Sequence, residues 1–195
     1  PCQSSAASDV YKRQILFQIQ KLRKLAQPFF LPIDQCTGFQ FIWLLFSLLF
    51  CVGGIVFSSI YLPNGNPIKS DKFNYKIAWM EKLKEHSKRL LDREVAVVLG
   101  GDFNVVPNDD DVHDPLAWQN DALCQLEARK KYRELINLGF SDAFRVFNDT
   151  PGRYTFWDYQ GGAWPKDHGV RIDHFLLSPH ALDICSGCNL SLIHI

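Results

Sequence analysis

The sequence predicts an α/β fold with an internal sheet, and three segments carry this prediction. Residues 55–62 (IVFSSIYL) and 95–99 (VAVVL) are apolar runs of strand length, rich in β-branched residues and followed by proline or glycine. Between them, residues 70–91 place most of their apolar side chains on one stripe of a helix. Strand, helix and strand in this order are typical of layered α/β domains.

Each element has its own local signal. Ser70 is placed to cap a surface helix of about twenty residues. The unbroken apolar run at residues 95–99 is typical of a central strand covered on both faces. A second helix is expected from about Glu127 to Leu138, with Gly139 in position to end it. Three later segments are expected as loops or strands, the last being the clearest strand: residues 140–147, 154–159 and 171–177.

Composition excludes some classes of protein. With 47% hydrophobic and 22% charged residues, the chain is neither disordered nor fibrous. The 21 basic and 21 acidic residues cancel, and charge alone therefore disfavours a DNA-binding role. The sum hides a break, because residues 1–68 hold seven charged residues and residues 69–195 hold thirty-five. Six scattered cysteines do not form a disulfide framework and indicate a reducing, cytoplasmic setting.

An uncharged stretch covers residues 35–68, and residues 41–52 within it are almost entirely apolar. Its length allows a transmembrane span. Gly53 and Gly54 interrupt the run, however, and the segment that follows them resembles a buried strand. A membrane-anchored, non-catalytic binding module is an alternative that requires residues 35–62 to cross a bilayer.

Polar residues follow the predicted central strand in the segment GGDFN, residues 100–104. Strand ends are the usual place for functional residues in an α/β sheet. In an extended chain Asp102 and Asn104 lie on one side, and Phe103 points back to the core. The carboxylate can bind a divalent metal or accept a proton, and the carboxamide can donate to an anionic oxygen. An Asx turn at a strand end explains the same residues without any function.

Tyr61 and Asn64 lie at the end of the preceding strand. The phenol can bond to a phosphate oxygen and the carboxamide to the same group or to a sugar, although a simple turn is equally compatible. The acidic residues 109–111 with Asp114 lack the pattern of a calcium-binding loop, and a solvated loop is expected there.

The segment RIDH, residues 171–174, is expected to alternate in a strand. Arg171 and Asp173 then share one face, and Ile172 and His174 share the other. Asp173 can orient an imidazole or pair with Arg171, and His174 is expected to be packed or exposed without a catalytic role.

The segment YTFWDY, residues 154–159, and the nearby Trp164 are unusually aromatic for a loop region. Such rings beside Arg153 and Arg171 can stack on bases and sugars of a nucleic acid, or can pack in the core. Trp157 is expected in the core.

The order of these motifs, YLPNGNP, VVLGGDFNV, YTFWDY and RIDHFLLS, resembles that of the bacterial exonuclease III family of the endonuclease/exonuclease/phosphatase superfamily. The resemblance covers about residues 55–183. It implies a four-layered α/β sandwich, here incomplete at both ends. It also implies Mg²⁺-dependent hydrolysis of DNA phosphodiesters at abasic sites and 3′ ends in base-excision repair, with Mn²⁺ as an alternative metal. A cytoplasmic monomer that binds duplex DNA, without a stable protein partner, is expected.

The same resemblance assigns catalytic roles to four residues. Tyr61 matches the tyrosine that contacts the scissile phosphate. Asp102 resembles the general base that activates water or its near neighbour, close to the metal. Asn104, also beside the metal, matches the residue that steadies the transition state, and Asp173 matches the carboxylate that orients the catalytic histidine.

Three further residues are implied as DNA contacts. Asn64 matches a substrate contact next to the tyrosine, and Phe156 stands where the family has an aromatic residue that lines the abasic pocket. Arg171 is expected to contact a phosphate. Another branch of the superfamily, acting on RNA or on a phosphorylated lipid or sugar, is the alternative within this class.

The chain also departs from the family pattern. The family has a metal-binding glutamate in a Gln-Glu motif, but residues 1–54 contain no glutamate, and it has a Ser-Asp-His motif, but His194 follows no aspartate. Residues 1–14 and 190–195 are expected to be adaptor-like, non-native segments. Residues 15–54 are an uncertain apolar segment without a family counterpart, and residues 55–189 a partial nuclease domain. The chain as written is therefore expected to lack the metal site and to have little or no activity.

Overall fold

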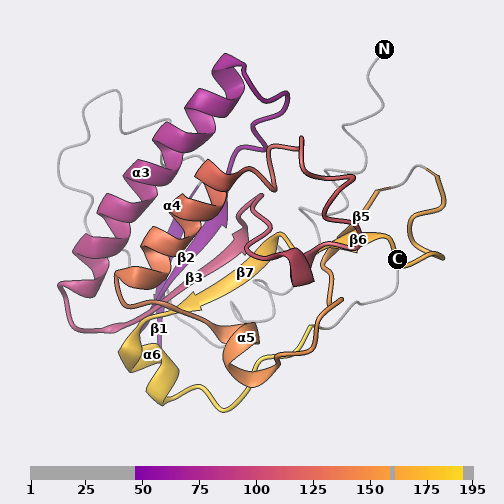
Figure 1. Cartoon of the computed structure of the whole chain (residues 1–195). Coiled ribbons are helices and arrows are strands. Elements are labelled where there is room, and N and C mark those ends of the chain that lie inside the picture. The colour runs from indigo at the N-terminus through magenta and orange to yellow at the C-terminus, as the bar shows by residue number, and fades with distance from the viewer. Residues whose placement is uncertain (1–46, 159–160, 191–195) are drawn as a thin grey trace.

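The computed structural model describes residues 47–158 and 161–190, which contain a mixed five-stranded sheet with helices packed on it (Figure 1). The strand order is β1-β2-β3-β7-β4. Parallel pairing joins β2 to β3, and the other neighbours pair antiparallel. The strands are β1 (Ser47–Val52), β2 (Ile55–Tyr61), β3 (Ala96–Asp102), β4 (Ser141–Asp142) and β7 (Asp173–Leu177).

Four α-helices and a small second sheet complete the described structure. The helices are α3 (Asp71–Leu91), α4 (Leu126–Asn137), α5 (Ala143–Phe147) and α6 (Pro179–Asp183). The second sheet pairs β5 (Phe156–Trp157) with β6 (Gly169–Val170), and a 3₁₀ turn, η1, covers Asp109–Asp111. The expectations for residues 1–14, 15–46 and 191–195 lie outside the described residues.

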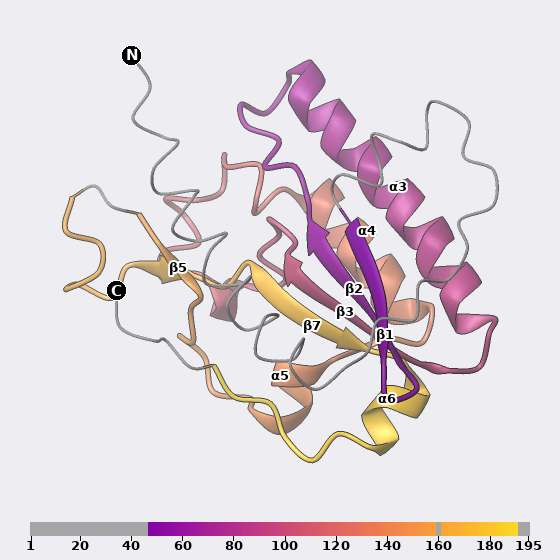
Figure 2. The same ribbon diagram turned by 180° about the vertical axis from the view of Figure 1, so that it is seen from behind.

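Successive side chains along β2 and β3 point to opposite faces of the sheet, and this alternation decides which of them form the core. Val56, Ser58 and Ile60 of β2 are buried, whereas their neighbours along the strand are only partly buried. Val97 and Leu99 of β3 pack with α3 and α4 in the main apolar cluster. Figures 1 and 2 show these two helices together on one face of the sheet.

The opposite face of β3 is also covered. Val98 packs there with Leu177, with Ala143 of α5 and with Ala181 of α6. The expectation of a central strand covered on both faces is therefore confirmed.

The two predicted long helices are confirmed. α3 begins after Ser70, although the Ser70 hydroxyl donates to the carbonyl oxygen of Pro67 and does not cap the helix. α4 ends at Asn137, and Gly139 follows with φ +121°, in the region that favours glycine. Residues 140–147, expected as a loop or strand, begin with the short strand β4 but continue as a helix, α5, which was not expected. The Asp142 carboxylate accepts hydrogen bonds from the amides of Phe144 and Arg145 and caps it.

The uncharged stretch ends in a β-hairpin within the described residues. β1 and β2 pair with Val52 opposite Ile55, and the two residues between them, Gly53 and Gly54, have φ +57° and +82°. Two consecutive positive φ angles are what a tight two-residue hairpin turn requires. Residues 47–61 are thus part of the sheet, and no described helix has the length and apolar character for a membrane crossing.

Replacing a core leucine tests this packing. Leu83 of α3 is completely buried in the main cluster, so Leu83→Ala is expected to lower the free energy of unfolding by about 2–5 kcal/mol. Leu116 is 76% exposed, and Leu116→Ala is expected to change it by less than about 0.5 kcal/mol. Urea unfolding followed by circular dichroism measures both, and equal effects would contradict the assigned core.

Candidate active site

Sheet register brings three of the predicted site residues into one row. Tyr61, the last residue of β2, is opposite Asp102, the last residue of β3. Asp102 is in turn opposite Asp173, the first residue of β7. The carboxyl ends of two parallel strands and the start of an antiparallel one therefore meet at one edge, where α/β sheets carry their ligands.

Asp102 and Asn104 contact each other directly. The Asn104 amide donates to Oδ1 of Asp102 (2.8 Å), and its side-chain Nδ2 donates to Oδ2 of Asp102 (3.1 Å) and to the carbonyl of Leu62 (2.7 Å). Asn104 has φ +47°, so the chain turns here and is not extended. The first contact is an Asx turn, and this turn brings the carboxylate and carboxamide together while Phe103 is buried in the core.

The surroundings of Asp102 disfavour the ionised form of its carboxyl group. Asp102 is only 8% exposed, and this burial, followed by the nearby charge of Asp173, raises its pKa well above the usual range. Two carboxylates that repel each other at a sheet edge fit an oxygen-preferring divalent cation, and Mg²⁺ is commonly held by one or two carboxylates with water. The described residues contain no cluster of three or more metal-ligating His, Cys, Asp or Glu side chains.

Tyr61 and Asn64 lie beside this carboxylate. The Asn64 carboxamide donates weakly to Oδ1 of Asn104, at 3.4 Å. Tyr61 is half-exposed, and burial and the charge of Asp102 raise the pKa of its phenol. The phenol therefore stays protonated at neutral pH and can donate to an anionic oxygen.

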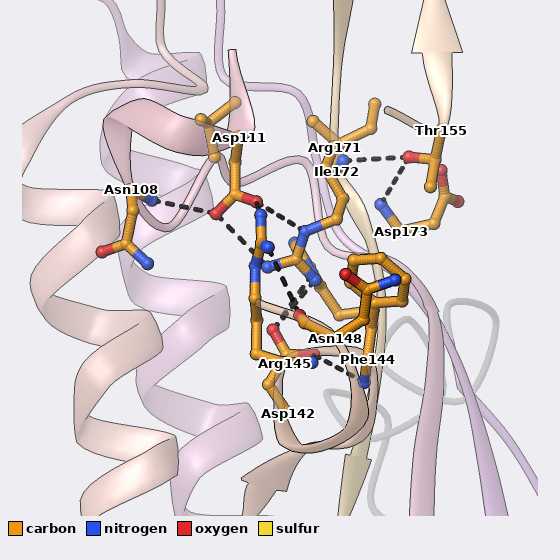
Figure 3. Close-up of polar contacts among 12 residues, drawn as sticks. Asn108, Asp111, Asp142, Phe144, Arg145, Asn148, Thr155, Arg171, Ile172 and Asp173 are labelled. Atoms are coloured by element: carbon orange, nitrogen blue, oxygen red, sulfur yellow. Dashed lines mark hydrogen bonds and ion pairs between the residues drawn. The ribbon is translucent and has the colours of Figure 1, made fainter. Parts of the chain in front are cut away.

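Arg171 is placed differently from the expected phosphate contact. Its side chain is completely buried, with Nε 2.7 Å from Oδ1 of Asp111 and Nη1 2.9 Å from Oδ2 of Asp142 (Figure 3). The expectation of a solvated loop is wrong for Asp111, which is fully buried and pairs with both Arg171 and Arg145. This ion-pair network anchors the segment just before Asp173. Because the Arg171 side chain is buried within the network, the structure does not support its direct contact with a phosphate.

His174 is packed within the same network, which is one of the two placements expected for it. Its Nε2 lies 2.8 Å from the carbonyl oxygen of Val105, and its Nδ1 lies 3.0 Å from Nη1 of Arg171. Since arginine only donates, Nδ1 accepts and Nε2 carries the proton. The expected separation of Arg171 and His174 on opposite faces is wrong, because β7 begins only at Asp173.

Thr155 fixes the backbone at Asp173. Its Oγ1 accepts hydrogen bonds from the amides of Ile172 (3.1 Å) and Asp173 (3.2 Å), as Figure 3 shows. Phe156, the next residue, is partly buried against the cluster that contains Val170 and Ile172. The predicted pocket residue Phe156 thus lies on the segment that pairs with the chain leading to Asp173.

Trp157 is not in the core, contrary to expectation. Its ring is partly exposed, its Nε1 donates to Asp167 (3.0 Å), and it makes edge contacts with Tyr154 and Trp164. Trp164 itself is 55% exposed. These aromatic rings therefore form a surface cluster beside the β5–β6 hairpin.

An α/β sheet with carboxylates and carboxamides at its strand ends defines the class of fold and site, and comparison with known proteins identifies the family. The profile of the endonuclease/exonuclease/phosphatase family matches residues 14–193. The chain belongs to this family, which confirms the resemblance drawn from the motifs. The expected domain boundaries at residues 14, 54 and 189 stay predictions.

Named relatives agree with this assignment. The chain is 33% identical over 121 residues to an exodeoxyribonuclease of Bacillus subtilis, covering 62% of this chain and 47% of that protein. It is 26% identical over 155 residues to exodeoxyribonuclease III of Haemophilus influenzae, covering 75% and 56%. The chain thus spans about half the length of these relatives.

Solved structures support the fold. A 3′-5′ exonuclease from Neisseria meningitidis matches with a TM-score of 0.70 and 33% identity, over 72% of this chain and 55% of that one. An AP endonuclease from Archaeoglobus fulgidus matches with a TM-score of 0.68 and 32% identity, over 71% and 54%. The predicted fold class is therefore confirmed, and the described residues form part of it.

The buried imidazole predicts an acid-sensitive fold. Burial and the Arg171 charge lower the pKa of His174 from its ordinary 6.5 to about 4. Between these values the unfolded chain binds more protons, so stability falls as the pH is lowered through this window. From pH 7 to pH 5 the loss due to His174 is expected to be about 2 kcal/mol.

Urea unfolding of His174→Gln at both pH values measures this loss. Burial also lowers the pKa of His86 to about 4, so His86 contributes to the loss of stability in the same pH window. The readout is therefore the difference in this loss between His174→Gln and the unchanged chain. His180→Gln, at an exposed position, is the control. An unchanged pH slope in His174→Gln would contradict the buried neutral ring.

Asp102→Asn is expected to have a pH-dependent effect on stability. Because folding raises the pKa of Asp102, the ionised form destabilises the folded chain increasingly as the pH rises above its ordinary value of 3.8. In metal-free buffer, the stability of Asp102→Asn relative to the unchanged chain is expected to be greater at pH 8 than at pH 5. The exposed Asp110, changed to Asn, should show no such trend in the same thermal unfolding series.

Proposed function

We propose that this chain carries part of the active site of a metal-dependent DNA phosphodiesterase of the exonuclease III type. The observation that supports the proposal most is the row of Tyr61, Asp102 and Asp173 at the sheet edge, with Asn104 bonded to Asp102. The names of the relatives, exodeoxyribonucleases and an AP endonuclease, support the same chemistry.

The proposed metal is Mg²⁺, with Mn²⁺ as an alternative, held by Asp102 with Asn104 beside it. When bound, the cation supplies charge stabilisation for the pentacoordinate phosphate and relieves the carboxylate repulsion. Asp102 is assigned as the general base that accepts a proton from the attacking water.

The remaining residues position the phosphate. The protonated Tyr61 phenol donates to a phosphate oxygen, and the carboxamides of Asn64 and Asn104 donate to substrate and transition state. Asp173, held by the Thr155 contact to its amide, orients a histidine. In this proposal Arg171 acts through the buried network and does not touch DNA.

The proposed substrate is duplex DNA with abasic sites or 3′ ends. Phe156, partly buried against the buried Ile172 next to Asp173, leaves part of its ring accessible, which suits a sugar without its base. A related structure is a 3′ phosphatase from Neisseria bound to a product DNA hairpin. The cytoplasmic setting and monomeric state expected from the sequence stay predictions.

A cleavage assay tests the proposal. For the purified 195-residue chain, little or no Mg²⁺-dependent cleavage of abasic duplex DNA is expected, and robust cleavage would refute that expectation of low activity. In a chimera, residues 55–183 replace the matching segment of the Bacillus subtilis exodeoxyribonuclease, and that relative supplies the rest of the domain. This chimera is expected to cleave abasic DNA.

Variants of the chimera assign the residues. Asp102→Asn is expected to lower the cleavage rate by about 10²–10⁴-fold, the usual contribution of a general base. Asp110→Asn, at an exposed position, is the matched control and should retain the rate. Full activity of Asp102→Asn, or preferential cleavage of RNA or inositol phosphates, would reject the DNA-specific proposal.

A further inference from the structure

Lys76 is a charged residue buried behind the candidate site. It lies on the inner face of α3 with no exposed surface, among residues of the main apolar core. Lysine is almost never fully buried without partners. Its partners therefore indicate what the residue does.

The Lys76 ammonium contacts three backbone carbonyl oxygens. Nζ lies 2.6 Å from the carbonyl oxygen of Asn104, and 3.0 Å from those of Asn64 and Ala122. An ammonium has three N–H donors and no acceptor, so all three donors are used. Hydrogen bonds from a charged donor are roughly twice as strong as neutral ones.

The three acceptors belong to three separate segments. Asn64 follows β2, Asn104 follows β3, and Ala122 lies before α4. The third segment is joined to the first by a hydrogen bond from the Ala122 amide to Oδ1 of Asn66 (2.9 Å). One side chain thus connects the segments that contain Asn64, Asn104 and Ala122.

The stem of Lys76 also shapes the first loop. At Gly65, with φ +87°, an added Cβ would lie 2.6 Å from Cδ of Lys76. The backbone of this loop therefore packs directly on the lysine stem, independently of the hydrogen bonds. Head and stem together fix the position of Asn64.

The charge of Lys76 is balanced nearby. Burial lowers its pKa to about 8, while Asp121 and Asp102 oppose this shift, so the group stays charged at neutral pH. Its positive charge also lies close enough to Asp102 to favour the ionised carboxylate. The bonds to the three carbonyls are therefore charge-assisted at neutral pH.

We propose that Lys76 is a positioning residue, which holds the Asn64 and Asn104 loops at a fixed spacing behind the candidate active site. The importance of these two asparagines rests on the proposed function. The competing explanation is that Lys76 contributes only to global stability, as any buried group does. The two explanations differ in where the structure loosens when the ammonium is removed.

Hydrogen exchange of the ¹⁵N-labelled 195-residue chain, followed by NMR, separates them. The reporters are the amides of Asn104 and Ala122, which donate to side-chain oxygens within the connected loops. The reference amides are those of Leu99 and Leu176 in paired core strands. In Lys76→Met, exchange at the reporters is expected to accelerate about tenfold or more relative to the reference amides. The carboxamide signals of Asn64 and Asn104 are expected to shift as well.

Lys84→Met is the matched control, because Lys84 lies on the same helix but forms surface ion pairs with Glu81 and Glu134. It should change neither reporter nor carboxamide signals. Lys76→Arg keeps the charge without a tetrahedral ammonium, and should also loosen the reporters relative to the reference. This variant provides the same test if Lys76→Met does not fold.

Equal acceleration at reporter and reference amides, or no change at either, would overturn the positioning role. These readouts require neither DNA nor metal. Failure of the cleavage assay would therefore reject the proposed function without altering this result, and failure of the exchange test would leave the proposed function intact.

Discussion

The repulsion between two carboxylates is the constraint on which the candidate site depends. Asp102 and Asp173 are opposite each other because β3 and β7 pair in one register, and a shift by one residue would move every side chain to the other face. Burial of Asp102 prevents water from screening the pair fully. A sheet edge that holds two such groups together is suited to a ligand that brings positive charge, which supports the proposed metal-assisted phosphate chemistry.

Two buried cations hold the chain segments around this site in place. Lys76 reaches the site from α3 and binds the loop carbonyls. Arg171 lies just before Asp173 and binds Asp111 and Asp142. Removing one partner of the buried Arg171 ion pairs would leave an unpaired charge. Removing the Lys76 ammonium would leave three carbonyl oxygens without their charged donor. The residues that contact substrate in the proposed function thus depend on residues that never touch it.

Local patterns in the sequence predict the elements that depend on local chemistry. The apolar runs of β2 and β3, the stripe of α3 and the polar cluster at Asp102 and Asn104 all follow from neighbours in the chain. Asp111 was missed because its arginine partners are 34 and 60 residues away. The sequence does not predict the burial of Lys76, because a lysine in a helix usually lies on its solvated face. It does offer one signal for α5, the capping residue Asp142.

Asp102 and Asp173 form one electrostatically coupled pair, in which the charge of Asp173 helps to raise the pKa of Asp102. Titration of the Asp102 side-chain carboxyl carbon by ¹³C NMR in metal-free buffer measures this coupling. We expect a midpoint well above the usual range for aspartate, and a lower midpoint for Asp102 in Asp173→Asn. A midpoint within the usual range that does not respond to Asp173→Asn would contradict it.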